Sequence, residues 1–132
     1  MTRGVIKQTV NLPARAEALH AMYMDPAVHA EITGGAVVIS ARRGSKFSAF
    51  DGTLSGATLA VVPSRLIVQS WRSKKFRDTD PDSTLILSFS PHGEDGRIDL
   101  VHLDVPKHDH DGVNEGWETY YWQPWRAYLA RR

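Results

Sequence analysis

The chain has 132 residues, a formal net charge of +1 at pH 7 and no cysteine, which excludes disulfides, iron–sulfur clusters and cysteine-ligated zinc. The balance of acidic and basic residues argues against nucleic-acid binding, which usually needs a basic excess, and no apolar run approaches the ~20 residues of a membrane span. We therefore expect a cytoplasmic protein in which residues 1–132 form one domain.

The N-terminal third predicts one strand followed by two helices. Residues 4–12 are β-rich, and residues 14–24 carry apolar side chains at helical spacing. A second helix is expected to begin at Asp25, a good N-cap, with Pro26 in its first turn. The glycines at 34–35 should end it.

Six short runs of β-branched or aromatic residues follow, and turn sequences separate them. Connections this short cannot make parallel crossovers, so the runs predict an antiparallel meander that must bury one face. With the first strand, they predict an α+β fold with about six to seven strands. The runs are residues 36–40, 46–50, 58–62, 66–72, 83–90 and 97–105.

The segment 113–129 predicts a long helix with one aromatic side, which would cover the meander. Its tyrosines and tryptophans indicate either core or the wall of a ligand pocket, because buried O–H and N–H groups need partners. Pro124 cannot bond the carbonyl of Tyr120. We expect either a bend or break near Gln123 with water on that carbonyl, or a kink over a curved sheet that leaves the carbonyl as an acceptor in a cavity. On a helical wheel, the apolar side holds Val113, Trp117, Tyr120, Tyr121, Pro124, Trp125 and Tyr128, with Glu118, Trp122 and Leu129 on its flank.

Histidines are the main candidates for metal-binding or cavity-lining polar residues. His108 and His110 alternate in a polar loop and could share a metal, but a site needs a third ligand, so we expect a helix-capping loop with no metal and no cofactor. His102 lies in an apolar run, either as a hydrogen-bonded structural group or as a polar group that lines a cavity. No phosphate loop, nucleophile elbow or dinucleotide fingerprint occurs.

A series of motifs in this order resembles a known family. The motifs are "FSAFDGTLSG" (47–56), Val62-Pro63, Gln69-x-Trp71-Arg72, His102-x-x-Val105-Pro106 and "GWETYYWQPW" (116–125). Together they resemble the activator of heat-shock protein 90 ATPase homologues, and in particular that family's C-terminal domain, within the START-like, or birch-pollen-allergen-like, helix-grip superfamily (SRPBCC). The resemblance implies a single START-like domain over residues 1–132, in which a curved antiparallel sheet wraps around the C-terminal helix, often with a cavity between them.

Three functions remain open on this basis. The first is a non-enzymatic binding module that holds an apolar or aromatic small molecule between the sheet and the last helix. The second, implied by the resemblance, is a protein-interaction module that binds an Hsp90-type chaperone. The third is a cyclase-type or hydratase-type enzyme in which His102 works with Asp104, although no catalytic residue is assigned. The residues expected to bind the ligand are Trp71, His102, Trp117, Tyr120, Tyr121 and Pro124.

Overall fold

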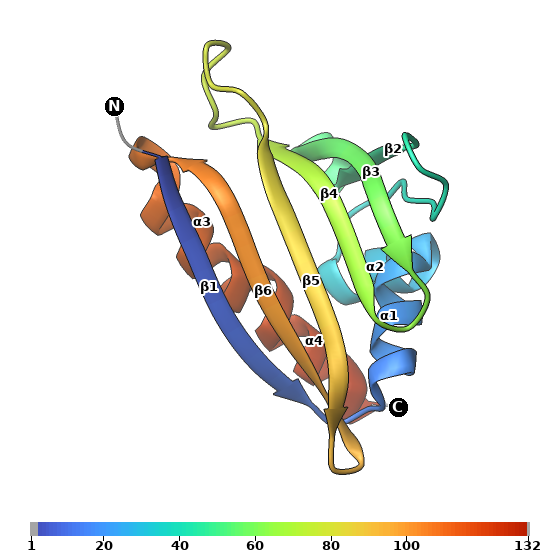
Figure 1. The fold of residues 1–132 in the computed structure, drawn as a ribbon. Coiled ribbons are helices and arrows are strands. Elements are labelled where there is room, and N and C mark those ends of the chain that lie inside the picture. The colour runs from blue at the N-terminus through green and yellow to red at the C-terminus, as the bar shows by residue number, and fades with distance from the viewer. Residues whose placement is uncertain (1–2, 132) are drawn as a thin grey trace.

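The computed structural model describes residues 3–131, with the side chains of residues 4–131 (Figure 1). Six strands and a long C-terminal helical segment make up most of the chain. In chain order the elements are β1 (Arg3–Leu12), α1 (Ala16–Met24), α2 (Pro26–Thr33), β2 (Lys46–Ala49), η1 (Phe50–Gly52), β3 (Leu54–Val62), β4 (Leu66–Ser73), β5 (Ser83–His92), β6 (Asp95–Pro106), η2 (Lys107–Asp109), α3 (His110–Trp117), η3 (Glu118–Trp122) and α4 (Gln123–Arg131).

The strands form one antiparallel sheet with the order β1-β6-β5-β4-β3-β2. This confirms the predicted α+β fold and the predicted meander, to which the first strand is added beside the last. The run at 36–40 is not a strand, because only Val38 bridges to Ser48. Since β2 is an edge strand of four residues, it offers little length for a further strand to pair with.

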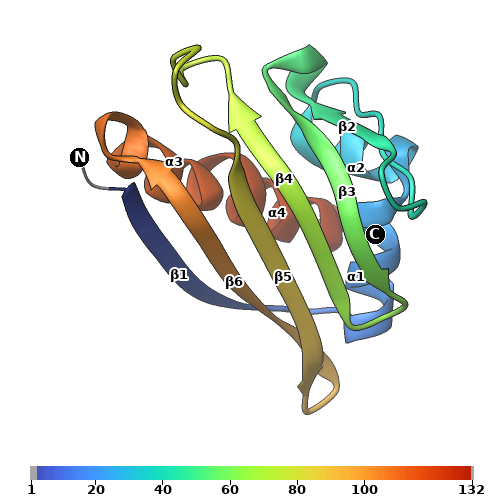
Figure 2. The same ribbon diagram turned by 45° about the horizontal axis from the view of Figure 1, so that its top comes forward.

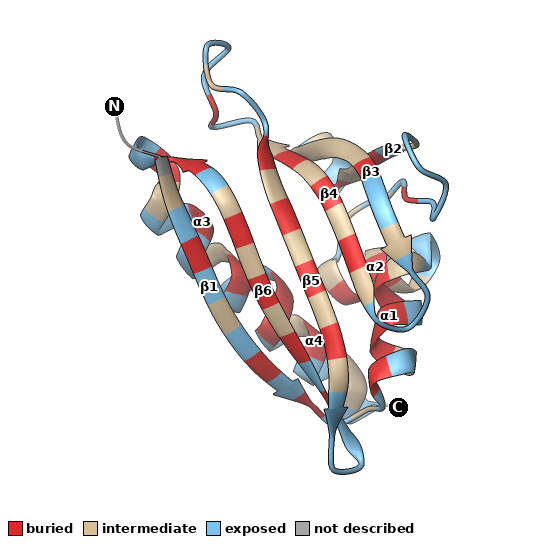
Figure 3. Cartoon of the chain, in the orientation of Figure 1, coloured by how far each residue is buried: buried red, intermediate tan, exposed pale blue. Residues whose placement is uncertain are grey.

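All the helices lie on one side of the sheet, as two views show (Figures 1 and 2). Buried and less buried positions alternate along β4, β5 and β6 (Figure 3), as expected when only one face of a sheet is covered. The segment α3-η3-α4 runs across this face and supplies Trp117, Tyr121, Trp122 and Trp125 to the core. The predicted grip of the sheet on the last helix is therefore confirmed.

α2 begins and ends where the sequence predicts, whereas α1 ends as expected at Met24 but begins at Ala16, two residues after the predicted start. The Asp25 carboxylate accepts hydrogen bonds from the backbone N–H groups of Ala27 and Val28, at 2.9 and 3.2 Å, and Pro26 occupies the first turn of α2. Gly34 ends α2 with a left-handed φ of 85°, a conformation that glycine adopts without strain. These caps orient α2, which carries His29 toward the long helix.

Pro124 is accommodated by a π-helical turn, η3, in which the N–H of Gln123 bonds to the carbonyl of Glu118, five residues back. A proline in a regular α-helix would clash with the carbonyl four residues earlier, here that of Tyr120. The wider turn inserts one extra residue and rotates the helix face. Tyr120 is therefore 58% exposed, whereas Trp122, expected on the flank, is only 3% exposed. π turns occur mostly as single insertions in α-helices, often at functional sites.

Candidate ligand-binding site

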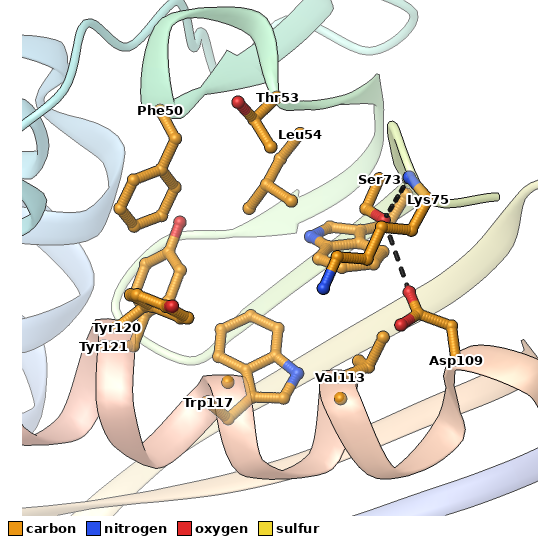
Figure 4. A pocket seen from close by; sticks show the side chains of 13 residues that line it. Phe50, Thr53, Leu54, Ser73, Lys75, Asp109, Val113, Trp117, Tyr120 and Tyr121 are labelled. Atoms are coloured by element: carbon orange, nitrogen blue, oxygen red, sulfur yellow. Dashed lines mark hydrogen bonds between the residues drawn. The ribbon is translucent and has the colours of Figure 1, made fainter.

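A cavity of about 300 Å³ lies between the long helix and the part of the sheet formed by β3 and β4 (Figure 4). Aromatic and aliphatic side chains make most of its wall. The helix contributes Val113, Trp117, Tyr120 and Tyr121, and the sheet and the turn before β3 contribute Phe50, Leu54 and Trp71.

Two helix glycines, Gly112 and Gly116, also line the cavity, four residues apart on the same helix face. A Cβ atom at Gly116 would meet only the ring of Tyr120, at 3.6 Å, so the missing side chain leaves open space. The volume of the cavity thus depends on small residues in the helix as well as on the shape of the sheet.

The cavity reaches the protein surface near Tyr120 and Lys75, both exposed residues. At this rim, Phe50 and Tyr120 make an edge-to-face contact with ring centroids 5.9 Å apart. The Phe50 ring also meets Tyr121 edge-on, at the same centroid distance. Phe50 therefore joins the exposed rim to the buried wall.

An unusual backbone turn holds Phe50 in this place. Phe50 and Asp51 have positive φ angles of 52° and 57°, a left-handed conformation that costs non-glycine residues about 1–3 kcal/mol each. The turn is tied to Ala36, whose N–H donates to the Asp51 carboxylate at 2.9 Å and whose carbonyl accepts from the Asp51 N–H at 3.2 Å. Such strain persists only where the surroundings enforce it, and here it positions a ring at the cavity.

One buried hydrogen-bond chain fixes Trp117. Its indole N–H donates to Nδ1 of His102 at 3.2 Å, so Nδ1 carries no proton. The proton on Nε2 is donated to Ser83 Oγ at 2.9 Å, and Ser83 in turn donates to the backbone carbonyl of Trp71 at 2.6 Å. All three hydrogen bonds are consistent with a neutral His102 that is protonated at Nε2.

A second buried chain fixes Tyr121, four residues further along the helix. The Tyr121 hydroxyl donates to Nε2 of His29 at 2.9 Å, and His29 Nδ1 donates to the carbonyl of Tyr23 at 2.8 Å. The Tyr23 hydroxyl donates to the side-chain oxygen of Gln69 at 2.6 Å. Trp117 and Tyr121, two wall residues, are therefore each held by a histidine from another element.

Burial keeps both histidines neutral. It lowers the pKa of His29 to about 4 and, with a smaller contribution from the charge of His110, lowers the pKa of His102 to about 3. Burial also raises the pKa of Tyr121 well above its ordinary value, which keeps its hydroxyl available as a donor. Both ring nitrogens of His102 have neutral partners, Ser83 and Trp117.

The structure brings four of the six residues expected to bind a ligand to the cavity: Trp71, Trp117, Tyr120 and Tyr121. His102 lies behind this wall and touches Trp117 rather than the cavity. Pro124 is not part of the lining, because it lies one turn beyond Tyr120, and it acts instead through the π turn. The buried indole N–H of Trp71 has no hydrogen-bond partner among residues 4–131.

The histidines of the polar loop do not converge. The 3₁₀ turn η2 breaks the extended geometry that would point them the same way, so His108 contacts the Asp80 carboxylate at 2.8 Å while His110 contacts the carbonyl of Val5 at 3.2 Å. Within the described residues, no group of three histidine or acidic side chains could hold a metal ion. The loop contributes Asp109 to the cavity instead.

Sequence reasoning assigned no ligand-binding role to Phe50, Leu54, Ser73, Lys75 or Asp109, all of which line the cavity. Phe50 and Leu54 lie within the "FSAFDGTLSG" motif, so the motif was the one sequence signal that could have indicated their role. Ser73 and Lys75 come from the end of β4 and the following loop, where isolated polar residues are typical of any surface turn.

An antiparallel sheet that grips a long C-terminal helix, with a cavity between them, defines this protein as a member of the helix-grip class. It belongs to the family of activator of Hsp90 ATPase homolog 1-like proteins, whose family model matches residues 13–130. Among curated relatives, it is similar to the activator of 90 kDa heat shock protein ATPase homolog 1 of Homo sapiens, with 25% identity over 107 residues. It is also similar to homolog 2 of Mus musculus, with 24% identity over 113 residues. The aligned parts cover 81% and 86% of this chain but only 31% and 34% of those proteins, so the chain spans about a third of their length.

Solved structures share the fold. An HSP90 activator from Plasmodium falciparum superimposes with a TM-score of 0.85 at 20% identity, and the match covers 96% of each chain. The Aha1 dimer from Colwellia psychrerythraea gives a TM-score of 0.77 at 9% identity, covering 91% of this chain and 92% of that one. At these identities the likeness shows the fold alone. None of the helices in residues 3–131 has the length and apolar character to cross a membrane.

Proposed function

We propose that this protein is a cytoplasmic binding module that holds a small apolar or aromatic molecule in the cavity between the sheet and the last helix. The observation that carries the proposal is the cavity itself, which is walled by Trp71, Trp117 and Tyr121 and opens to the surface beside Tyr120. Apolar cavities with a few polar groups are the usual form of small-molecule sites.

A rigid aromatic wall favours the binding of a flat ligand. Aromatic rings bury large areas and favour stacked or edge-on contacts with a flat ligand, worth roughly 0.5–1.5 kcal/mol per pair beyond burial. Because His102 and His29 hold Trp117 and Tyr121 in place, these rings lose little freedom when a ligand enters. His102 therefore supports binding through Trp117, and Pro124 supports it by setting the π turn.

Replacement of Gly116 by leucine is expected to abolish ligand binding while the protein stays folded, because the new side chain would occupy the cavity. Gly116→Ala should stabilise the protein by about 0.5–1 kcal/mol, because alanine is a better helix former and the site has room for a Cβ atom. Urea unfolding measures the stability. Tryptophan fluorescence, titrated with a panel of small aromatic molecules, measures binding.

The matched control is Glu115→Leu, which adds the same side chain at the neighbouring exposed position outside the cavity. It should leave binding unchanged. Equal binding by Gly116→Leu and the unaltered protein would contradict the proposed site, and a lack of binding by every aromatic probe would contradict the function.

A second candidate function is binding to an Hsp90-type chaperone. It is favoured by family membership and by the match with the Plasmodium falciparum HSP90 activator, which spans nearly all of both chains. Isothermal titration with the chaperone, with and without nucleotide, would test it. Undiminished chaperone binding by Gly116→Leu would show that the two functions use different surfaces, and no binding at high micromolar concentration would remove this candidate.

A further inference from the structure

One end of the cavity differs from the rest, because a nearly buried carboxylate lies there. Asp109 is 8% exposed and lies at the start of the long helix. Its Oδ2 atom has one side-chain hydrogen-bond partner in the described chain, Ser73 Oγ at the long distance of 3.4 Å. Figure 4 shows the Asp109 side chain directed from the helix toward Ser73 at this end of the cavity.

A lysine lines the same end. Lys75 is exposed, and Figure 4 shows its side chain extending over the cavity toward Trp117. In the part of the chain that the structure describes, no ion pair joins Lys75 to Asp109. The cavity therefore has an apolar body and one end that carries a nearly buried carboxylate and an exposed ammonium.

The charges of Asp109 and Lys75 determine which polar group a ligand can carry at this end of the cavity. The Asp109 carboxylate is nearly buried, so a second anion beside it would be repelled with little screening by solvent. A cationic group would face the ammonium of Lys75. A hydroxyl group fits both, because it donates to a carboxylate and accepts from an ammonium.

The volume limits the rest of the ligand. About 300 Å³ is at the small end of the ~300–1,000 Å³ that ligand sites span. The rings of Trp117 and Tyr121 lie 4.7 Å apart at 39° and present a broad aromatic surface. A flat molecule of one or two rings matches this space.

We propose that the ligand is an uncharged, flat ring compound with a hydroxyl group that donates a hydrogen bond to Asp109 and accepts one from Lys75. The proposal rests on the proposed function, since it names the ligand class of the same cavity. It makes Asp109 the residue that determines specificity, by favouring a hydroxyl over a carboxylate on the same ring system.

The test compares four probes with one ring system at pH 7: naphthalene, 2-naphthol, 2-naphthoate and 2-(aminomethyl)naphthalene. Dissociation constants come from tryptophan quenching and from isothermal titration. We expect 2-naphthol to bind at least about tenfold more tightly than 2-naphthoate, as a hydrogen bond to a charged group would give. In Asp109→Asn this preference should shrink to within about threefold, because the amide no longer repels a carboxylate.

The matched control is Asp111→Asn, which makes the same change at a fully exposed aspartate two residues further along. It should keep the preference of the unaltered protein. Asp109→Ser is a second variant, and circular dichroism and urea unfolding check that each variant is folded.

The outcomes separate the two proposals. Tighter binding of 2-naphthoate or of the ammonium probe, or an unchanged preference in both Asp109 variants, would overturn the hydroxyl class and leave the binding function standing. A lack of binding by all four probes would overturn the binding function, and the ligand class with it.

Discussion

Lowering the pH from 7 to 5 is expected to destabilise the protein by about 4 kcal/mol through His29 and His102 alone. Both histidines are neutral in the folded protein, with pKa values of about 4 and about 3, against an ordinary value of 6.5. At pH 5 the unfolded chain therefore binds a proton at each site and the folded protein does not, which costs roughly 2 kcal/mol per histidine.

The direction of this effect follows from the lowered pKa values. The stability is fully present above about pH 6.5 and is lost as the pH falls toward 4 at His29 and toward 3 at His102. His20 adds to the loss in the same direction, because burial lowers its pKa too. Since small proteins are stable by about 5–15 kcal/mol, a loss of about 4 kcal/mol is a large fraction of the total stability.

Urea unfolding at pH 7, 6 and 5 measures this dependence. His29→Leu and His102→Leu should each be less stable at pH 7, because Tyr121 or Trp117 loses its acceptor, and each should lose about half of the pH dependence. His92→Gln, which removes an exposed histidine at the end of β5, is the control and should keep the full dependence. An unchanged dependence in both leucine variants would show that these histidines are not the cause.

The order of elements was predictable because local signals repeat along the chain. Period-two runs separated by turn residues identify β3 to β6, and the Asp25-Pro26 start and the glycine stop identify α2. The resemblance added the curvature of the sheet and the grip on the last helix. The strand predicted at 36–40 does not form, because a strand also needs the edge of another strand to pair with, which a local sequence pattern does not reveal.

The face of the last helix was predicted only in part, because a helical wheel assumes α geometry throughout. The signal for the departure was Pro124, but a proline can cause a kink, a break or a wider turn. The π turn spans residues 118–122 and rotates its own residues about the helix axis relative to a regular α-helix, so Trp122 becomes buried and Tyr120 reaches the surface.

The polar partners were not predictable, because they come from elements far apart in the sequence. His29 and Tyr121 are 92 residues apart and meet only when α2 packs beside η3. Asp109 lies in the 3₁₀ turn η2 and Lys75 in the turn after β4, and each segment looks like an ordinary solvated turn in the sequence. Their shared place at one end of the cavity depends on how β4 and the long helix cross.

Trp117 contributes both to the stability of the core and to the wall of the cavity. Its indole N–H donates to His102, and its ring lines the cavity and packs against Tyr121 and Trp122. The contacts that stabilise the core thus position the ligand-binding wall. A change at this residue should affect stability and binding together, and by amounts that depend on which atoms are removed.

Replacement of Trp117 by alanine is expected to lower the free energy of unfolding by about 3–5 kcal/mol and to abolish ligand binding. The ring is 2% exposed, and truncation would both enlarge the cavity and leave His102 Nδ1 without a donor. Trp117→Phe keeps an aromatic wall but removes the N–H, so it should cost less than the alanine variant and weaken binding only a few-fold. Urea unfolding and tryptophan quenching, which Trp71 still reports, measure both effects.

The control that separates the two roles is Trp122→Phe. Trp122 is as deeply buried as Trp117, stacks on it with centroids 5.6 Å apart and donates to Gln8 at 2.7 Å, yet it does not line the cavity. Its replacement should lower stability by an amount comparable to that of Trp117→Phe and leave the dissociation constant unchanged. If Trp122→Phe weakened binding as much as Trp117→Phe, the loss would follow from a loosened helix, and Trp117 would not be a ligand contact.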